Sequence, residues 1–215
     1  MIIKTALRSL RRAAPADEAA ATAIADIDGE VTRLNRLVND VLDFAKPIRF
    51  DIAEADLAAI CQGAALAAMA DGAPPRVDVR LGASEAPIAT DAERIRAALV
   101  NLLVNARQSV AAQAVNGSAA DLPPVVIETR DGVRGDVEIV VSDQGGGIAP
   151  GDLPRIFDPF FTTRRTGSGL GLAIVRNVIE GLGGRIAVQS RLGEGTAVTV
   201  VLPRPQGPSA HTGTA

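Results

Sequence analysis

Two asparagine side chains on one predicted helix are the first candidates for chemistry in this 215-residue sequence. Asn101 and Asn105 are four residues apart, so on a helix they lie one turn above each other. The apolar face of the same helix, from which both asparagines are displaced, consists of Ile95, Leu99, Leu102, Leu103 and Ala106. Because amide oxygens are suitable ligands for Mg²⁺, the pair indicates a metal site, although a solvated helix face would show the same spacing.

A carboxylate followed by three glycines forms the second candidate segment. Residues 143–148 read Asp-Gln-Gly-Gly-Gly-Ile and follow a predicted strand over residues 137–142. Glycines such as Gly145 and Gly147 remove side chains where the backbone approaches a flat ligand, and Asp143 can accept a hydrogen bond from an amine there. The segment is compatible with a pocket for a planar amine and also with an ordinary glycine turn.

A second glycine-rich segment precedes a predicted helix. Residues 167–172 read Gly-Ser-Gly-Leu-Gly-Leu and open onto an apolar run through Ala173, Ile174 and Val178. Glycines before a helix leave backbone N–H groups free to bind anionic oxygens, which predicts a phosphate-binding loop. A Rossmann fingerprint is rejected, because no strand directly precedes the loop and no acidic residue ends a second strand about 20 residues later.

Alternating short strands and helices position these three segments. Helices are predicted near residues 55–70, 91–114 and 169–182. The predicted strands cover residues 48–52, 77–81, 125–129, 137–142, 185–189 and 197–202. This order predicts an α/β two-layer sandwich, and the aperiodic stretch of residues 143–168 is long enough to favour a functional lid.

A different pattern occupies the N-terminal residues. Apolar residues from Ile24 to Ala45 recur at alternating spacings of three and four, and a shorter run precedes them, so residues 1–46 are predicted to form a helical hairpin. The second arm is longer than the first, which implies dimerisation or a missing upstream piece. Pro47 ends the hairpin; residues 47–204 are predicted to be the α/β domain and residues 205–215 a disordered tail.

Composition excludes several classes of function. Lys plus Arg is 22 against 25 for Asp plus Glu, a net charge of −3, so no broad cationic surface for nucleic acid is expected. Cys61 is the only cysteine, which excludes an internal disulfide framework and fits a small buried side chain. The most apolar stretch, residues 58–70, is too short to span a bilayer, and we expect a cytoplasmic protein.

Taken in order, four segments resemble the N, G1, F and G2 boxes of two-component sensor histidine kinases. They are residues 101–106, 143–148, 156–164 and 167–172. Residues 193–196, Gly-Glu-Gly-Thr, and a closing strand that ends at Pro203 complete the resemblance, which covers about residues 48–204. It implies the ATP-binding catalytic domain of such a kinase, with a mixed sheet covered by helices on one face.

The resemblance also implies individual roles. Asn105 would coordinate the Mg²⁺ that bridges the ATP phosphates, while Asn101 and Arg164 would act on the phosphates, Arg164 at the γ-phosphate. Asp143 would accept the adenine amino group, and Thr196 would reach the same edge through water. The other implied nucleotide-binding residues are Gly145, Gly147, Ile148, Gly167, Ser168, Gly169, Leu170 and Gly171. The residues implied to anchor the lid are Phe157, Phe160 and Phe161.

The residue type at position 101 distinguishes phosphoryl transfer from ATP hydrolysis. In ATP-hydrolysing members of the wider superfamily, such as type II topoisomerases and mismatch-repair proteins, a glutamate one turn before the metal asparagine activates water. This chain has Asn101 there, and an amide is no general base near neutral pH. The resemblance therefore favours a kinase over an ATPase.

The phosphate acceptor and the partners follow from the same resemblance. Residues 1–46 resemble a truncated dimerisation domain that lacks the H box, and the single histidine, His211, lies in the predicted tail. We expect this chain to bind Mg²⁺-ATP without autophosphorylating, as part of a homodimeric kinase whose phosphohistidine serves the receiver domain of a response regulator. The alternatives are a noncatalytic nucleotide-dependent interaction module and an anti-sigma-type serine kinase; the hairpin and the F box argue against the serine kinase.

Overall fold

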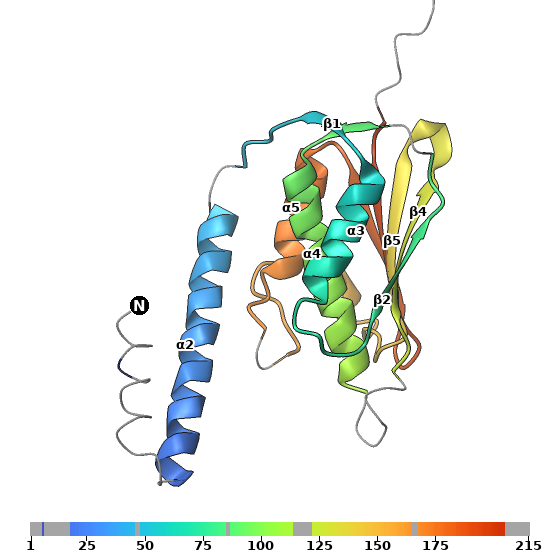
Figure 1. Ribbon diagram of the computed structural model, residues 1–215. Coiled ribbons are helices and arrows are strands. Elements are labelled where there is room, and N and C mark those ends of the chain that lie inside the picture. The colour runs from blue at the N-terminus through green and yellow to red at the C-terminus, as the bar shows by residue number, and fades with distance from the viewer. Residues whose placement is uncertain are drawn as a thin grey trace, which may run out of the picture.

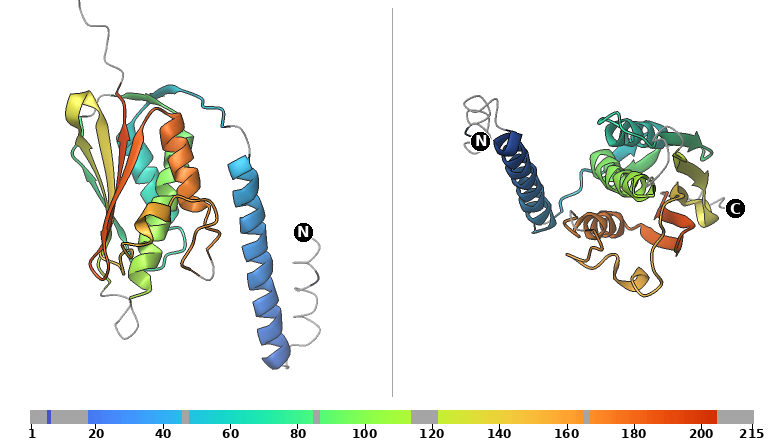
Figure 2. Two further views of the ribbon diagram at one scale, coloured as in Figure 1. Left: turned by 180° about the vertical axis from the view of Figure 1, so that it is seen from behind. Right: turned by 90° about the horizontal axis from the view of Figure 1, so that it is seen from below.

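The computed structural model describes residues 18–45, 48–84, 87–113, 122–164 and 167–204, together with Ala6. Five of the strands in these ranges form one sheet. Helices α3 (Leu57–Ala68), α4 (Ala92–Ala111) and α5 (Gly171–Gly181) cover one of its faces (Figure 1). Seen from behind and from below, the sheet and the helices form two separate layers (Figure 2). This confirms the predicted two-layer α/β fold.

The main sheet has the strand order β2-β4-β5-β7-β6. Strands β2 and β4 run parallel, and the remaining neighbours run antiparallel, so the sheet is mixed. All five were predicted close to their observed bounds, which are Val77–Leu81 for β2, Val125–Asp131 for β4, Val137–Asp143 for β5, Arg185–Arg191 for β6 and Gly195–Leu202 for β7. Residues along β4 and β5 alternate between buried and less buried, which explains why the alternating hydrophobic pattern of both strands was visible in the sequence.

The predicted strand over residues 48–52 is wrong. These residues have no strand pairing, and a short strand β1 (Ala53–Ala55) follows them and pairs with β3 (Ile88–Thr90), which the sequence did not reveal. The Asp51 backbone N–H instead donates to Asp91 Oδ2 at 3.0 Å. The Phe50 ring packs on Gly181, so side-chain contacts rather than a ladder hold this linker.

Three helices form the layer that covers the sheet. α3 (Leu57–Ala68), α4 (Ala92–Ala111) and α5 (Gly171–Gly181) lie within the three predicted segments. Asp56 caps α3 by accepting from the Ala58 N–H at 2.8 Å, and Asp91 caps α4 by accepting from the Arg94 N–H at 3.0 Å. The acidic caps explain where both helices begin.

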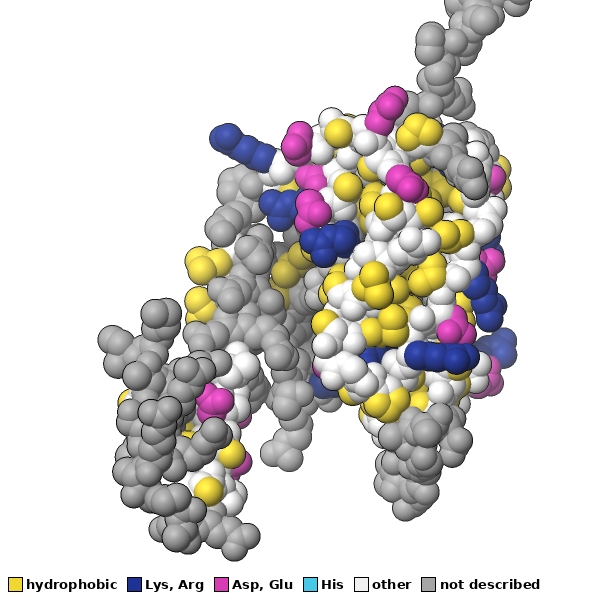
Figure 3. All heavy atoms as spheres, viewed as in Figure 1, with side chains coloured by type: hydrophobic (Ala, Val, Ile, Leu, Met, Phe, Trp, Pro, Cys, Tyr) yellow, Lys and Arg dark blue, Asp and Glu magenta, His cyan; other side chains and the backbone are white. Residues whose placement is uncertain are grey.

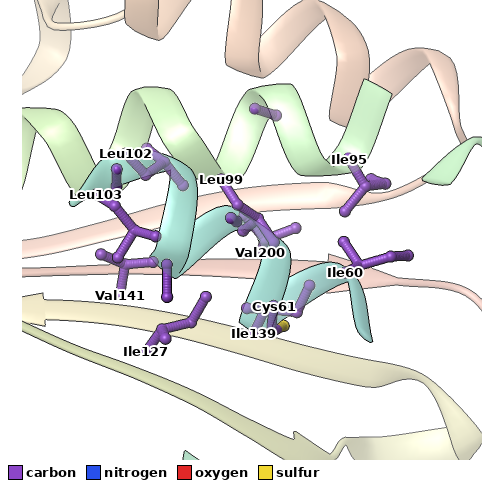
Figure 4. Close-up of a cluster of buried hydrophobic side chains, with 14 of the residues drawn as sticks. Ile60, Cys61, Ile95, Leu99, Leu102, Leu103, Ile127, Ile139, Val141 and Val200 are labelled. Carbon is purple, nitrogen blue, oxygen red and sulfur yellow. The ribbon is translucent and has the colours of Figure 1, made fainter. Parts of the chain in front are cut away.

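The core lies between α3, α4 and the sheet. Four fully buried or nearly fully buried residues of α4 face the strands, namely Ile95, Leu99, Leu102 and Leu103 (Figure 4). Opposite them lie Ile127, Ile139, Val141 and Val200. Cys61 of α3 is fully buried there, and burial, aided by the Asp56 carboxylate, raises the pKa of its thiol to about 12. Cys61 is therefore the small buried side chain that was predicted.

Helix α2 (Glu18–Ala45) is the long second arm of the predicted hairpin. It lies beside the helical layer and contacts α5 (Figures 1 and 2). Its exposed large apolar residues are Ile27, Leu34, Val38, Val41 and Leu42. The first arm, apart from Ala6, lies outside the described residues, as does the tail over residues 205–215.

The surface offers little sign of one dominant charge. On the face that includes α3, Arg side chains lie among Asp and Glu side chains, and hydrophobic side chains lie between them (Figure 3). None of the helices in the described ranges combines the length and apolar character needed to cross a bilayer.

Candidate functional site

A cavity of about 610 Å³ lies where α4, the start of α5 and the segment after β5 meet. This volume is in the range of small-molecule sites. The predicted site residues that line it are Asn101, Asn105, Gly147, Ile148, Arg164, Gly167, Ser168, Gly169, Gly171 and Thr196. Asp143, Gly145 and Leu170 are not among the lining residues. The structure thus brings the four sequence segments together around one cavity.

The two asparagines on α4 face the first residue of α5. Asn101 Nδ2 donates to the Ala97 carbonyl at 3.3 Å, which leaves Oδ1 as the outward atom of this amide. A Cβ built on Gly171 would lie 3.5 Å from Asn101 Oδ1 and 4.0 Å from Asn105 Nδ2. Both amides therefore lie next to the phosphate-binding loop predicted from the sequence.

The polar side chains here suit a Mg²⁺ ion that is bound jointly by the protein and a phosphate ligand better than an ion that is held by protein side chains alone. Among the described residues, no cluster of three or more Asp, Glu, His or Cys side chains could hold a metal ion. Mg²⁺ commonly takes one or two protein oxygens and completes its shell with phosphate oxygens and water. The Asn105 amide, which lies beside the predicted phosphate-binding loop, is compatible with that mode.

Asp143 is the last residue of β5 and pairs with Thr196 of β7. Its Oδ1 accepts a hydrogen bond from the Gly145 N–H at 2.8 Å. Burial raises the pKa of the Asp143 carboxyl, while the Gly145 and Thr196 backbone amides and the Arg164 charge oppose the rise. A partly desolvated carboxylate at the end of a strand is suited to accept a hydrogen bond from a ligand amine.

Two glycines of the G1 segment are required by close packing. A Cβ on Gly145 would lie 2.6 Å from the carbonyl carbon of Ser109 on α4. Gly147 has φ +66°, and its Cβ would lie 2.7 Å from the carbonyl carbon of Arg191. Absence of side chains lets this turn lie flat against its neighbours.

Ser190 on β6 joins the two sides of this pocket. Its hydroxyl accepts from the Ile148 N–H at 2.9 Å, lies 2.9 Å from the Gly195 carbonyl and is 2.9 Å from Thr196 Oγ1. Sequence reasoning missed Ser190, because a serine within an ordinary strand has no distinguishing spacing. It holds the predicted residues Ile148 and Thr196 in place.

The predicted phosphate-binding loop, residues 167–172, has its own backbone constraint. Gly169 has φ +69°, and its carbonyl accepts from the Phe160 N–H at 3.0 Å. The next residue, Leu170, is fully buried and anchors the start of α5. No side chain caps α5, in contrast to α3 and α4. Its first N–H groups are therefore available to an anion.

Arg164 crosses from the lid to α4. Its guanidinium donates to Gln108 Oε1 at 2.7 Å, to the Asn105 carbonyl at 3.0 Å and to Asn105 Oδ1 at 3.4 Å. Burial lowers the pKa of Arg164, and the Asp143 carboxylate opposes this shift. The predicted γ-phosphate arginine thus lies directly beside the predicted metal asparagine.

The three phenylalanines of the lid do not act alike. Phe161 lies under the Arg155 guanidinium, 4.6 Å from ring centroid to Cζ, and Phe157 lies 5.6 Å from Arg176 Cζ. Phe160 is 64% exposed, so its side chain is not buried as an anchor of the lid would be. Phe160 contributes through its backbone, which adopts φ 67° to meet Gly169.

Two further polar residues of α4 line the cavity without having been predicted. Gln108 and Ser109 follow Asn105 by three and four residues, which places them on the same side of the helix. Extending the helical spacing by one turn beyond Asn105 would have identified both.

Comparison with known proteins identifies the family. Residues 90–206 match the family described as "Histidine kinase-, DNA gyrase B-, and HSP90-like ATPase". The sensor histidine kinase ZraS of Salmonella typhi is 35% identical over 176 residues, which are 81% of this chain and 36% of that protein. The signal transduction histidine-protein kinase AtoS of Escherichia coli K12 is 32% identical over 181 residues, 83% of this chain and 28% of that protein.

Solved structures agree on the fold. The crystal structure of full-length ShkA in complex with AMPPNP has a TM-score of 0.70 at 24% identity and covers 94% of this chain and 45% of that one. The mycobacterial sensor histidine kinase MprB has a TM-score of 0.55 at 26% identity and covers 73% of this chain and 100% of that one.

The chain spans about a third of the length of ZraS and less of AtoS. The match over residues 90–206 nevertheless covers more than half of the present sequence and includes all four boxes around the cavity. The chain belongs to the histidine kinase-, DNA gyrase B- and HSP90-like ATPase family and contains the ATPase catalytic domain of a sensor histidine kinase.

Proposed function

We propose that the cavity binds Mg²⁺-ATP for transfer of the γ-phosphoryl group to a histidine, from which the group passes to an aspartate of a response regulator. The observation that supports transfer over hydrolysis is the pair of Asn101 and Asn105 beside Gly171. Hydrolytic relatives have a glutamate in place of Asn101, and an amide does not take a proton from water. The site can orient the phosphates without activating water.

The proposed orientation of ATP follows the chemistry of the walls. The adenine amino group donates to Asp143, and the base lies over the Gly145–Gly147 turn near the apolar side chains of Ile148 and Leu192. The phosphates lie at the other end, against the uncapped N-terminus of α5 and the Gly171 backbone.

Catalysis in this arrangement consists of positioning and charge stabilisation. Asn105 Oδ1 would hold the Mg²⁺, and the ion would supply positive charge at the phosphate oxygens. The acceptor imidazole nitrogen attacks the γ-phosphorus as the bond to the β–γ bridging oxygen breaks and ADP leaves. Arg164, on leaving Asn105, reaches the charge on the transferred group, and Asn101 orients the phosphates from one turn before Asn105.

Transfer in trans tests the proposal. The chain is mixed with a separate sensor-kinase dimerisation domain that contains its acceptor histidine, and γ-labelled ATP is added. We expect acid-labile label on the acceptor domain with the wild type and at least a tenfold loss with Asn105→Ala and Asp143→Ala. Gln62→Ala, at an exposed position of α3 outside the cavity, is the matched control. Equal Mg²⁺-ATP affinity in Asn105→Ala and wild type contradicts the site assignment.

The chain alone is proposed to bind nucleotide without labelling itself, because His211 is its only histidine and no acidic residue neighbours it in the sequence. Acid-labile phosphohistidine on the isolated chain would contradict this. The division into a hairpin over residues 1–46, a catalytic domain over 47–204 and a tail over 205–215 also stays a prediction. Limited proteolysis tests it, with stable fragments expected to begin near residue 47.

A noncatalytic interaction module is the second candidate, and the exposed apolar face of α2 favours it. Leu34 and Val38 of that face are 57% and 56% exposed. In the kinase proposal this face packs against a second copy of the chain. A fragment that forms a nucleotide-sensitive complex with a full-length kinase but never labels a supplied acceptor domain would be an interaction module instead.

A further inference from the structure

Gln108 forms the shortest hydrogen bond to the lid arginine, and the proposed function gives it no role. It lies on α4 three residues after Asn105, so the two side chains are neighbours on one side of the helix. Gln108 Oε1 accepts from Arg164 Nη1 at 2.7 Å, and the same nitrogen lies 3.4 Å from Asn105 Oδ1. Arg164 Nη2 donates to the Asn105 backbone carbonyl at 3.0 Å. Three acceptors on α4 thus hold one guanidinium.

This arrangement places a protein cation at the oxygen that the proposed function assigns to Mg²⁺. Asn105 Oδ1 is an amide oxygen that the Arg164 guanidinium already approaches, with Nη1 at 3.4 Å. A divalent ion bound to the same oxygen would lie within a few ångströms of the Arg164 charge, and the two like charges would repel. Arg164 and Mg²⁺ therefore exclude each other at Asn105.

We infer that Gln108 is a positioning residue that holds Arg164 over Asn105 in the absence of nucleotide, so that Mg²⁺-nucleotide must displace the guanidinium to reach Asn105. The inference rests on the proposed roles of Asn105 and Arg164. Binding then has two coupled results. The metal gains its amide ligand, and Arg164 is released next to the phosphates that it is proposed to meet.

The chemical character of Gln108 suits a releasable contact. A neutral amide oxygen binds a guanidinium less strongly than a carboxylate does, and a carboxylate at this position would also attract the metal. Gln108 is exposed, so water can replace Arg164 as its partner when the guanidinium leaves. The contact is strong enough to orient Arg164 and weak enough to break on binding.

A double-mutant cycle with Mg²⁺-ADP tests the inference. ADP has no γ-phosphate for Arg164 to contact, so its affinity reports the displacement step. The variants are Gln108→Met, Arg164→Met and the double variant. Methionine at position 108 keeps the side-chain length and the helix propensity without the acceptor, and at position 164 it removes the donor. Affinities are measured by isothermal titration calorimetry, with Gln62→Met on the exposed side of α3 as the matched control.

We expect Gln108→Met to bind Mg²⁺-ADP about threefold more tightly than the wild type, because a partly exposed hydrogen bond no longer has to be broken. In the Arg164→Met background the same substitution changes nothing, and Gln62→Met changes nothing in either. Unchanged or weaker binding in Gln108→Met overturns the inference. An equal gain with and without Arg164 also overturns it, since the effect then does not act through the arginine.

Failure of the inference is distinguishable from failure of the proposed function. If wild type binds Mg²⁺-ADP and Asn105→Ala does not, while Gln108→Met is unchanged, only the role of Gln108 is wrong. If wild type fails to bind Mg²⁺-ADP, or Asn105→Ala binds it equally well, the assignment of Asn105 is wrong and the role of Gln108 falls with it.

Discussion

Gly145 and Ser109 approach so closely that no side-chain carbon fits between them. A Cβ on Gly145 would lie 2.6 Å from the Ser109 carbonyl carbon and 2.7 Å from its Cβ. The contact joins the end of β5, where Asp143 lies, to the helix that bears Asn101 and Asn105. This close approach helps to hold the two ends of the proposed nucleotide site at their observed separation.

Gly145→Ala should therefore damage the site as well as the fold. The added methyl must push the turn away from α4, at a cost of about 2 kcal/mol in unfolding free energy, and Mg²⁺-ATP affinity should fall at least about tenfold. Thermal melting and calorimetry measure the two effects. Gly151→Ala is the matched control, since a Cβ there meets no heavy atom within 4 Å. Normal nucleotide affinity in Gly145→Ala would show that the separation does not matter.

Arg107 should be one of the most sensitive polar residues of the fold. It is 6% exposed and donates to the carbonyls of Ala68, Ala73 and Pro75 and to Asp71 Oδ1. Arg107→Met leaves several acceptors without this donor at the end of α3, and we expect a loss of about 3 kcal/mol in urea unfolding.

Asp71→Asn provides the comparison for Arg107. The Asp71 side chain is 61% exposed, and its removal as a charge leaves the three carbonyl contacts intact. We expect little change in the urea midpoint. A loss as large as that of Arg107→Met would mean that the ion pair, rather than the carbonyl contacts, stabilises this region.

Gly181→Ala should loosen the linker that follows α2. A Cβ on Gly181 would lie 2.6 Å from Phe50 Cζ, so the ring must move, and we expect a net loss of about 1 kcal/mol despite the better helix propensity of alanine. The penalty should disappear when Gly181→Ala is made in a Phe50→Ala background. Gly29→Ala on α2, where a Cβ meets nothing within 4 Å, should instead be neutral or stabilising. Additive penalties in the double variant would exclude the ring contact as the cause.

Asp143 should give the nucleotide-free protein a pH-dependent penalty. Burial raises the pKa of its carboxyl in the folded protein above the ordinary 3.8. At a pH between the ordinary pKa and the raised one, the folded state therefore binds more protons than the unfolded state. Stability from this group is greatest at and below the ordinary pKa and declines as pH rises through the raised one. Asp143→Asn lacks the decline, so its melting temperature relative to wild type should increase with pH across this window.

The same ionisation should govern adenine binding. Because the ionised carboxylate accepts the amino proton, Mg²⁺-ATP affinity should fall on acidification at a higher pH than an ordinary aspartate would require. Calorimetry across this pH range checks it. An affinity that stays constant down to the ordinary pKa would separate Asp143 from the adenine contact.

Elements with a clear hydrophobic period were predictable from the sequence. α4 presents a continuous apolar face to the sheet, and β4 and β5 alternate in burial, so their positions could be read directly. The three-residue strands β1 and β3 are too short to show a period, and their pairing joins residues on either side of α3. The sequence therefore revealed the main sheet and missed the small one.

The candidate site also has a part that the sequence indicated and a part that it did not. Asn105 and the glycine segments could be proposed from the sequence because their spacing along the chain is itself the signal, and they do line one cavity. The Arg164–Gln108 contact joins positions 56 residues apart, and neither residue type marks the other in the sequence. Contacts of this kind are determined by how the lid returns to α4, which only the folded chain defines.

The 11 residues of α5 connect two regions that are far apart in the sequence. The helix begins at Gly171, beside the asparagines, and ends at Gly181, under the Phe50 ring of the linker. At 1.5 Å per residue it is a stiff lever about 16 Å long. If nucleotide binding favours one orientation of α5, it also favours the position of Phe50 that packs against that orientation. Thermodynamic reciprocity then requires that a change that favours this position of Phe50 raises nucleotide affinity by the same factor.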